Sequence, residues 1–379
     1  MRVEVHASVT AVTPSQWDTL IGDSPFARHS FLAALEHSGS IGGQTGWLPQ
    51  YLCAYDDADK LLGALPAYIK HHSYGEYVFD WAWAGAYARA GVPYYPKLVV
   101  AIPFTPATGT RIFTHAHASR ADVTTALLAA LRAHGDALGV SSIHWLFTPE
   151  DETAVLERNG YLRRVGCQFH WHNAGFAAFD DFLAGFSAQK RKKIKRERRF
   201  VHEAGVEMEA VAGTEATAAH WRAIYEFYRA TIRKHGAVPY LQESFFDEIA
   251  RTQPETAVLI LARHGGRYVA GALNLRSRDT LYGRYWGCID EFHSLHFETC
   301  YYRALEYCIE HRIARFEAGA QGEHKLARGF LPAPTYSAHW LSHPEFARAV
   351  ADFLTREQNG VEYYMSELHE HSPFKKDCP

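Results

Sequence analysis

Short apolar runs of strand length alternate with polar turns in two separate parts of the chain. In the first part the runs are YLCAY at 51–55 and LLGALPAYI at 61–69. In the second part they are AVLILAR at 257–263 and YVAGALNLR at 268–276. Runs rich in β-branched and aromatic residues and bounded by turn signals predict antiparallel meander strands.

The two parts carry the same letters at one fixed offset. Gly-Ala-Leu begins at Gly63 and at Gly271, and 271 − 63 = 208. The glycines of Tyr-Gly-x-Tyr are Gly75 and Gly283, and 283 − 75 = 208. We therefore expect the aromatic runs YGEYVF and YGRYWG to form the third strand of each meander.

A second pair of matches lies further along the chain. Gly160-Tyr161-Leu162 and Gly329-Phe330-Leu331 are each followed nine residues later by tryptophan, and 329 − 160 = 169. The first copy therefore contains 208 − 169 = 39 additional residues, which we assign to the Gly/Pro-rich stretch at about 85–120. This insert is expected to form either a lid over a cleft or a longer β-hairpin.

Collinear repeats of this kind predict a tandem duplication, in agreement with a length that favours two domains. The expected division is a first domain at 1–178, a linker helix at 179–205 and a second domain at 206–379, which ends in a helix starting at Pro344. Each copy is expected to contain two helices, a meander, a helix, a strand, a helix and a final strand.

The central helix of the second copy is expected at 297–312, since apolar positions recur on one helical face at Tyr301, Leu305 and Cys308. The second copy also contains a cluster of Glu, His and Lys residues at 317–325, whereas the matching stretch of the first copy, WLFTPEDETAVLERNGY, contains only charges that are ordinary for a helix. This difference favours the second copy as the catalytic one.

The predicted linker helix is strongly basic. Eight of the ten residues from Lys190 to Arg199 are Lys or Arg, and the only acid among them is Glu197. Ser187 can cap this helix. The run is either a solvated face or a contact surface for the phosphates of a tRNA or a diphosphate-linked substrate. Its candidate contact residues are Lys192, Lys193 and Arg196.

Composition narrows the possibilities. The chain has 379 residues, is 47% hydrophobic and has a net charge of −3, so a site for a polyanion would have to be local. Six cysteines without a CxxC pattern indicate reduced thiols. The N-terminus lacks a signal-peptide pattern, and no apolar run approaches the roughly 18 residues of a membrane helix. These features predict a cytoplasmic protein with no transmembrane segment.

The junction between the copies resembles a known family. Fem-type peptidoglycan aminoacyltransferases have a Ser-x-x-x-Arg-x-x-Ile-Arg/Lys helix ending in Gly-Val, and it is matched here by Ser187, Arg191, Ile194, Lys195 and Gly205-Val206. YGEYVFDWAW, HFETCYY and EAGAQGEHKLARG are similar to the FemAB-like peptidoglycan biosynthesis/recognition group. The resemblance covers the whole chain. It implies an α+β fold of two tandem GNAT-like domains, with a basic connecting helix and transfer of an acyl or aminoacyl group to an amine.

The segment 317–329 is the densest cluster of reactive side chains. Glu317 ends a predicted strand, small residues follow it, and His324 and Lys325 begin a short helix. A base at a strand end beside a cation suits attack of an amine on a carbonyl group. The alternative is a loop with solvated charges.

The family resemblance adds a lysine followed closely by Gly-Phe, which serves the transfer step. Gly329-Phe330 match this pattern, and both Lys325 and Arg328 are candidates for the cation. We expect one cleft in the second copy. Its catalytic residues would be Glu317, His324, Lys325 and Tyr282. Its substrate-binding residues would be Arg284, His296, Glu298 and Arg328, together with Lys192, Lys193 and Arg196.

The donor is expected to be an aminoacyl-tRNA or another activated acyl group, and the acceptor an amine such as that of a cell-wall precursor. Acyl-CoA is the second candidate, because CoA-dependent relatives have a Gly-rich phosphate loop where this chain has no glycine between Cys288 and Cys300. His296 and Glu298 in this segment are either site residues or helix caps. A third possibility is a non-catalytic module that recognises a cell-wall precursor. Histidine pairs without an HExxH or Cys/His pattern predict no metal, and no further cofactor is expected.

Overall fold

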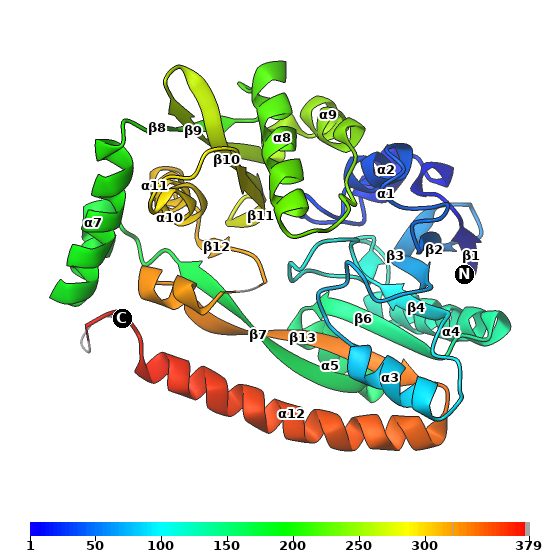
Figure 1. Cartoon of the computed structure of the whole chain (residues 1–379). Coiled ribbons are helices and arrows are strands. Elements are labelled where there is room, and N and C mark those ends of the chain that lie inside the picture. Colours follow the sequence, from blue (N-terminus) through cyan, green and yellow to red (C-terminus); the bar gives the residue numbers. More distant parts are fainter. Residues whose placement is uncertain (321, 376–379) are drawn as a thin grey trace. The chain divides into compact units, whose positions relative to one another are not determined.

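The computed structural model describes residues 1–320 and 322–375, which form two compact units (Figure 1). Unit 1 comprises Met1–Cys167 and Pro334–Tyr364, and unit 2 comprises Gln168–Ala333 and the residues from Met365 onward. The elements within unit 1 are β1 (Arg2–His6), η1 (Val9–Ala11), α1 (Pro14–Asp18), α2 (His29–His37), β2 (Trp47–Tyr55), β3 (Leu61–Lys70), α3 (Trp81–Arg89), β4 (Lys97–Val100), β5 (Phe113–Thr114), α4 (Arg120–Leu138), β6 (Ser142–Thr148) and α5 (Glu150–Arg158).

Unit 2 contains the basic helix and the second meander. Its elements are α6 (Phe179–Ala184), α7 (Ala188–Glu203), β8 (Glu207–Ala212), α8 (Ala218–Lys234), α9 (Glu243–Thr252), η2 (Pro254–Thr256), β9 (Ala257–His264), β10 (Arg267–Arg276), β11 (Thr280–Cys288), α10 (Leu295–Phe297), η3 (Glu298–Tyr302), α11 (Arg303–Glu310), β12 (Arg315–Glu317) and η4 (Glu323–Arg328). Elements with residues in both units are β7 (Leu162–His172), β13 (Leu331–Leu341) and α12 (Pro344–Glu370).

The sheet of unit 1 runs in the order β1-β2-β3-β4-β6-β13, with β4 and β6 parallel. Helix α4 contacts β1, β2 and β3, and Val123 and Leu131 of α4 share a core with Leu52 of β2. Successive residues of a strand point to opposite faces. Tyr51 accordingly lies on the other face, where Trp17 of α1 packs against it with ring centroids 5.6 Å apart.

The sheet of unit 2 runs in the order β7-β12-β11-β10-β9-β8, with β11 and β12 parallel. Gly271 of β10 faces α8, since a Cβ atom there would lie 3.0 Å from the Ile224 side chain. The next residue toward the N-terminus, Ala270, shares a core with Val201 of α7 and Leu295 of α10. Helix α8 therefore covers one face of this sheet, and α7 and α10 cover the other (Figure 1).

The closing strand of each unit comes from the other half of the chain. In unit 1, β6 pairs antiparallel with β13, and Ser142 lies opposite Leu341. In unit 2, β12 pairs antiparallel with the end of β7, and Arg315 lies opposite His172. The compact units thus divide the chain differently from the limits predicted from the repeat, 1–178, 179–205 and 206–379. The duplication itself stays a prediction.

The third strand predicted for the first copy is wrong. YGRYWG lies in β11, whereas the residues of YGEYVF belong to a segment of turns at 71–80, in which Tyr77 has a φ of 61°. Glu76 and Asp80 are buried against Lys97. These ion pairs, rather than the alternation of apolar and polar residues, determine the conformation of the segment. β3 pairs instead with β4.

The insert is also placed differently from the expectation. The stretch at 85–120 contains β4 and β5, two strands of the sheet, so it is neither a separate lid nor a single hairpin. The chain between β3 and β4 spans 71–96, whereas the chain between β10 and β11 spans only 277–279. The additional length lies mainly in this first connection.

The predicted helices of the second half are confirmed, with two local differences. Helix α7 follows Ser187 as its N-cap, although the serine side chain makes no capping hydrogen bond. The helix expected at 297–312 is interrupted by η3, a π-helical turn, which is a feature found frequently at functional sites. Helix α12 begins at Pro344, as expected. Within the described residues, no helix is both long and apolar enough to cross a membrane.

Candidate active site in the second unit

Three polar side chains form a row across neighbouring strands of unit 2. Tyr282 of β11 pairs with Glu317 of β12, and Glu317 pairs with His170 of β7. Paired residues on neighbouring strands point to the same face of a sheet. All three are buried, with exposed fractions of 7%, 3% and 7%. The row therefore places a carboxylate between a phenol and an imidazole.

One cation lies beside the carboxylate of the row, and its two neighbours in the row are uncharged. Arg315 Nε lies 3.2 Å from Glu317 Oε1. Burial, together with the charge of Glu317, raises the pKa of Tyr282. Burial, with smaller contributions from Arg315 and His172, lowers the pKa of His170 to about 3. His170 is therefore neutral at physiological pH, and its Nε2 lies 3.4 Å from Gln168 Oε1.

Lys325 of η4, one of the predicted catalytic residues, is also buried. It is 1% exposed, and its Nζ donates a hydrogen bond to the carbonyl oxygen of Gly319, 2.7 Å away and two residues beyond Glu317. The charge of Lys325 contributes to lowering the pKa of His170, which places the two side chains in one electrostatic neighbourhood. Burial lowers the pKa of Lys325 itself to about 8. Both protonation states of this amine are accessible near neutral pH.

His324 and His296 form an aromatic group beside Lys325. His324 Nε2 is hydrogen-bonded to the Tyr301 hydroxyl at 2.9 Å, and its ring lies 5.7 Å from that of His296. Burial lowers the pKa of both histidines, that of His296 to about 4, and the cations of η4 add to this effect. Both imidazoles are therefore neutral around pH 7.

The guanidinium group of Arg328 contacts α7, η4 itself and an aromatic ring. Its Nη2 donates to Glu197 at 2.9 Å, its Nη1 donates to the carbonyl oxygen of His324 at 2.7 Å, and its guanidinium lies 3.3 Å from the ring centre of Phe297. Gly329 then turns the chain with a φ of 87°, at a point where a Cβ atom would lie 2.7 Å from the Phe182 ring. Of the two candidate cations, these contacts leave Lys325 as the better one for chemistry.

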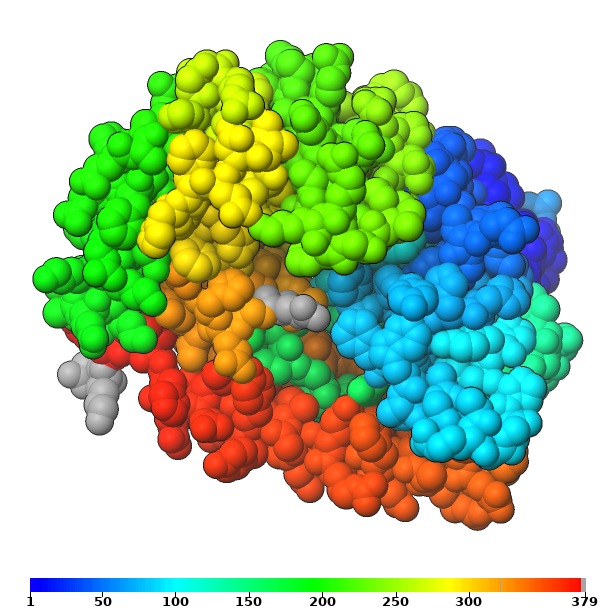
Figure 2. All heavy atoms as spheres, in the orientation of Figure 1, coloured from blue at the N-terminus to red at the C-terminus, as the bar shows by residue number. Residues whose placement is uncertain are grey.

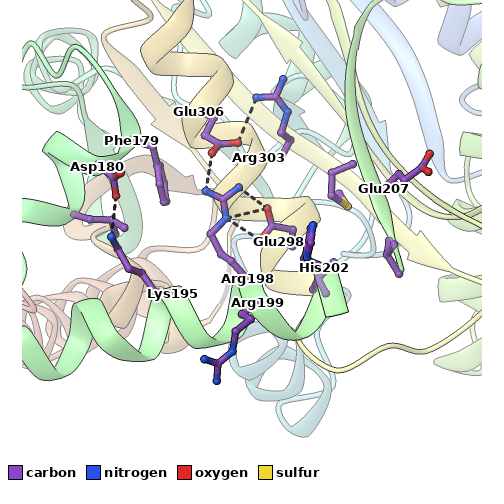
Figure 3. A pocket seen from close by; sticks show the side chains of 14 residues that line it. Phe179, Asp180, Lys195, Arg198, Arg199, His202, Glu207, Glu298, Arg303 and Glu306 are labelled. Atoms are coloured by element: carbon purple, nitrogen blue, oxygen red, sulfur yellow. Dashed lines mark hydrogen bonds and ion pairs between the residues drawn. The ribbon is translucent and has the colours of Figure 1, made fainter. Parts of the chain in front are cut away.

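Glu298 faces an open pocket whose lining does not include the residues of the row. It is 3% exposed and accepts hydrogen bonds from Arg198 of α7, at 2.9 to 3.1 Å. The same guanidinium donates to Glu306 and lies 4.7 Å from the ring centre of Phe179. These groups line an open pocket of about 730 Å³ in which positive and negative side chains are balanced (Figure 3). Arg199 points away from the pocket in this view.

The basic face of α7, defined as Lys192, Lys193 and Arg196, lies on the exposed side of the helix. Helical spacing places it opposite the buried stripe of Ile194, Glu197 and Val201. Figure 2 shows the side chains of this segment at the surface of the second unit. Within residues 1–320 and 322–375, no ion pair engages Lys192 or Arg196. Lys193 Nζ lies 4.0 Å from Glu197. Among the other predicted residues, Arg284 is half-buried beside the Tyr285 ring.

The structure thus groups Tyr282 and Glu317, and separately His296, His324 and Lys325, while Glu298 and Arg328 bind side chains of α7. Sequence reasoning missed His170, although its place in a repeated His-Trp pair gave a signal. Sequence reasoning also missed that Glu197 is buried and binds Arg328. The signal for this was that Glu197 is the only acid in a basic run. Together these residues make the candidate active site a feature of unit 2, and their catalytic roles stay a prediction.

Unit 1 contains a second buried group of charges that the sequence did not reveal. Lys97 Nζ donates to Glu76 at 2.8 Å, to Asp80 and to Ser73 at 2.8 Å, and all four side chains are at most 3% exposed. Among the described residues, one oxygen of Glu76 and one of Asp80 are buried without a hydrogen-bond partner. Burial raises the pKa of Glu76 to about 7 despite the nearby Lys97. We call this group the Lys97 cluster.

One comparison with known proteins places the chain in a family. A family model described as FemAB-like, peptidoglycan biosynthesis/recognition, matches residues 8–376. The chain belongs to the FemAB-like family. Among the described residues, no group of three or more His, Cys, Asp or Glu side chains could hold a metal ion. Among curated protein sequences, none matches the chain.

Solved structures of other proteins share the fold of this FemAB-like chain. FemX is 12% identical with a TM-score of 0.55, and the match covers 93% of this chain and 100% of FemX. The C-terminal domain of a putative lysylphosphatidylglycerol synthetase from Agrobacterium fabrum is 10% identical with a TM-score of 0.54, covering 89% and 94%. L-PGS from Bacillus licheniformis is 10% identical with a TM-score of 0.50, covering 88% and 97%. The α+β fold of two tandem GNAT-like domains with a basic connecting helix is confirmed.

Proposed function

We propose that this FemAB-like protein transfers an aminoacyl group from aminoacyl-tRNA to an amine of a cell-wall precursor. The observation that carries the proposal is the buried row Tyr282–Glu317–His170, together with Lys325, which is hydrogen-bonded to the carbonyl oxygen of Gly319, two residues beyond Glu317. Membership of a family described by peptidoglycan biosynthesis/recognition supports an aminoacyltransferase-type role in that process. The acceptor and the donor are our own inference from the chemistry of the site.

In the proposed reaction the acceptor nitrogen attacks the ester carbonyl, a C–N bond forms, and the C–O bond to the tRNA breaks. Glu317 takes a proton from the attacking amine, because a carboxylate held in a buried row is a suitable base. Lys325, whose pKa is about 8, is still largely protonated at pH 7 and gives a proton to the leaving oxygen. Tyr282 and neutral His170 orient the carboxylate between them.

The basic face of α7 supports the choice of donor. Exposed lysine and arginine side chains bind phosphates by releasing counterions, and this binding does not depend on base sequence. Acyl-CoA is the second candidate donor. It would need a phosphate cradle, and the segment 289–299, which leads into η3, contains no glycine to form the usual one.

The test is a transfer assay with purified protein, total tRNA charged with radiolabelled amino acids, and a soluble muropeptide precursor. Label should move to the precursor, and Glu317→Gln should slow the transfer at least about a hundredfold. The exposed variant Glu323→Gln, on the same loop, serves as the matched control. Transfer from acetyl-CoA but not from aminoacyl-tRNA would replace the donor. Precursor binding without transfer from either donor would favour the recognition module.

A further inference from the structure

The only acid in the basic run of α7 turns inward. Glu197 is 6% exposed and lies on the same helical stripe as Ile194 and Val201, which are 1% and 2% exposed. Burying a carboxylate costs free energy unless it is paired and hydrogen-bonded. The contacts of Glu197 therefore identify what the buried face of this helix is built to hold.

Glu197 accepts hydrogen bonds from two elements next to the candidate active site. The Tyr302 hydroxyl of the π-helical turn η3 donates to its Oε2. Arg328 Nη2 of η4 donates to the same oxygen at 2.9 Å. Arg328 also donates to the carbonyl oxygen of His324 at 2.7 Å, so it ties both ends of η4 to one carboxylate. Lys325 lies between these two ends.

The buried and exposed faces of α7 thus serve different purposes. The exposed face carries the cations that are free to meet phosphates. The inner side of the helix contacts η4 through the carboxylate of Glu197, which binds Arg328. It contacts η3 through Arg198, which binds Glu298. A donor bound on the exposed face would contact the same rigid helix that holds the Lys325 segment in place.

We propose that Glu197 is a positioning residue, which acts through Arg328 to set the place of Lys325 and so links the helix that binds the donor to the chemistry. This inference rests on the proposed function for the identity of the reaction. The contacts of Glu197 with Arg328 and Tyr302 do not depend on that function. Removing the charge of Glu197 leaves Arg328 without its partner and frees η4 to move.

The test uses Lys325 as its own probe and needs no substrate. Wild type and Glu197→Gln are treated with limiting acetic anhydride at several pH values, and acetylation of Lys325 is followed by peptide mass spectrometry. Because burial holds the pKa of Lys325 at about 8, loosening η4 should admit water and move the midpoint of the labelling profile upward. We expect a shift of at least about half a pH unit.

Glu203→Gln is the matched control, since Glu203 is an exposed acid on the same helix and pairs only with Arg199 in the ion pairs of the described residues. This variant changes the net charge equally and should leave the midpoint in place. Arg328→Gln should reproduce the effect of Glu197→Gln, and the double variant should be no worse than either. Tyr302→Phe removes one donor and provides a milder variant if Glu197→Gln fails to fold.

A tRNA titration separates this inference from the proposed function. Glu197→Gln should bind tRNA within about twofold of wild type, because the exposed cations remain. A Lys325 profile in Glu197→Gln and Tyr302→Phe identical to that of wild type would overturn the positioning role. Failure of the wild type to bind tRNA would count against the donor assignment, while the labelling result would still stand.

Discussion

Unit 1 buries Lys70 and Lys97 and unit 2 buries Lys325, and the surroundings of Lys97 and Lys325 are opposite. Lys97 in unit 1 is 0% exposed and is bonded to the carboxylates of Glu76 and Asp80. Lys325 in unit 2 is 1% exposed and donates to a backbone carbonyl oxygen. Within residues 1–320 and 322–375, no ion pair engages Lys325.

The difference decides what each amine can do. Burial alone would lower the pKa of both. At Lys97 the two carboxylates outweigh burial and raise the pKa, so this lysine stays charged and holds the 71–80 segment in place. At Lys325 burial prevails, and the pKa falls to about 8. A compensated lysine serves structure, whereas an uncompensated one is available for proton transfer.

The largest effect should come from breaking the Lys97 cluster. Lys97→Met removes the ammonium group that is bonded to both buried carboxylates, which should lower the free energy of unfolding by about 3–5 kcal/mol at pH 7. Urea denaturation measures this loss, and Lys60→Met, an exposed position on the β2–β3 turn, is the control. Lowering the pH should restore part of the stability, because Glu76 can then be neutral. A decrease in the free energy of unfolding of less than about 1 kcal/mol would contradict a structural role for Lys97.

The same substitution in unit 2 should damage chemistry more than stability. Lys325→Met keeps an apolar stem in the buried site and removes the proton carrier together with its hydrogen bond to the Gly319 carbonyl oxygen. We expect transfer to fall about a hundredfold and the free energy of unfolding to change by less than about 1.5 kcal/mol. Lys234→Met, at an exposed lysine of the same unit, should change neither quantity. A stability loss as large as that of Lys97→Met would show that the two lysines do not differ in the proposed way.

The pH dependence of stability should distinguish the two lysines directly. Between pH 8 and 10.5 the unfolded chain binds more protons at Lys325 than the folded chain, so this group makes the protein more stable as the pH rises. The gain should be on the order of 2 kcal/mol and absent in Lys325→Met. Lys97, with its raised pKa, contributes its full stabilisation below pH 10.5 and loses it only above. Denaturation series at pH 8, 9 and 10 would contradict this assignment if wild type and Lys325→Met gave parallel curves.

The smallest effect concerns the surface of α7. Changing Lys192, Lys193 and Arg196 to Glu should weaken tRNA binding more than about tenfold at low salt, and the salt dependence of the remaining binding should become flatter. The fold should stay intact, since the three side chains are exposed. Binding is measured at two salt concentrations against tRNA, a diphosphate-linked precursor and acetyl-CoA. Salt-insensitive acetyl-CoA binding that survives the triple change would favour the CoA donor.

Much of the fold follows from local pattern. The meander strands of the second half, the basic helix and the helix beginning at Pro344 each have a periodicity or a terminus signal that the structure respects. YGEYVF fails for a physical reason. Its aromatic letters favour a strand, but burying Glu76 and Asp80 against Lys97 depends on a residue some twenty positions away. No local pattern reports such a long-range charge pair.

The residues of the candidate site also divide into those that local sequence indicates and those that depend on long-range contacts. Glu317 and Lys325 could be singled out because reactive residue types gather at a strand end. The repeated His-Trp pair marked His170 but not its partner, because His170 reaches Glu317 through the pairing of strands from different halves of the chain. Glu298 and Arg328 looked like site residues by type, and only their bonds to Arg198 and Glu197 reveal that they hold the basic helix in place.

The exchanged closing strands have a consequence for how the protein is made. Ser142 of β6 pairs with Leu341, so 341 − 142 = 199 further residues must be synthesised after Ser142 before its partner is present. During that time the first unit has an unpaired sheet edge at β6. An unpaired edge can form hydrogen bonds with a strand of another nascent chain. A premature stop codon late in the gene should therefore leave not one sound unit and one defective unit, but two incomplete ones.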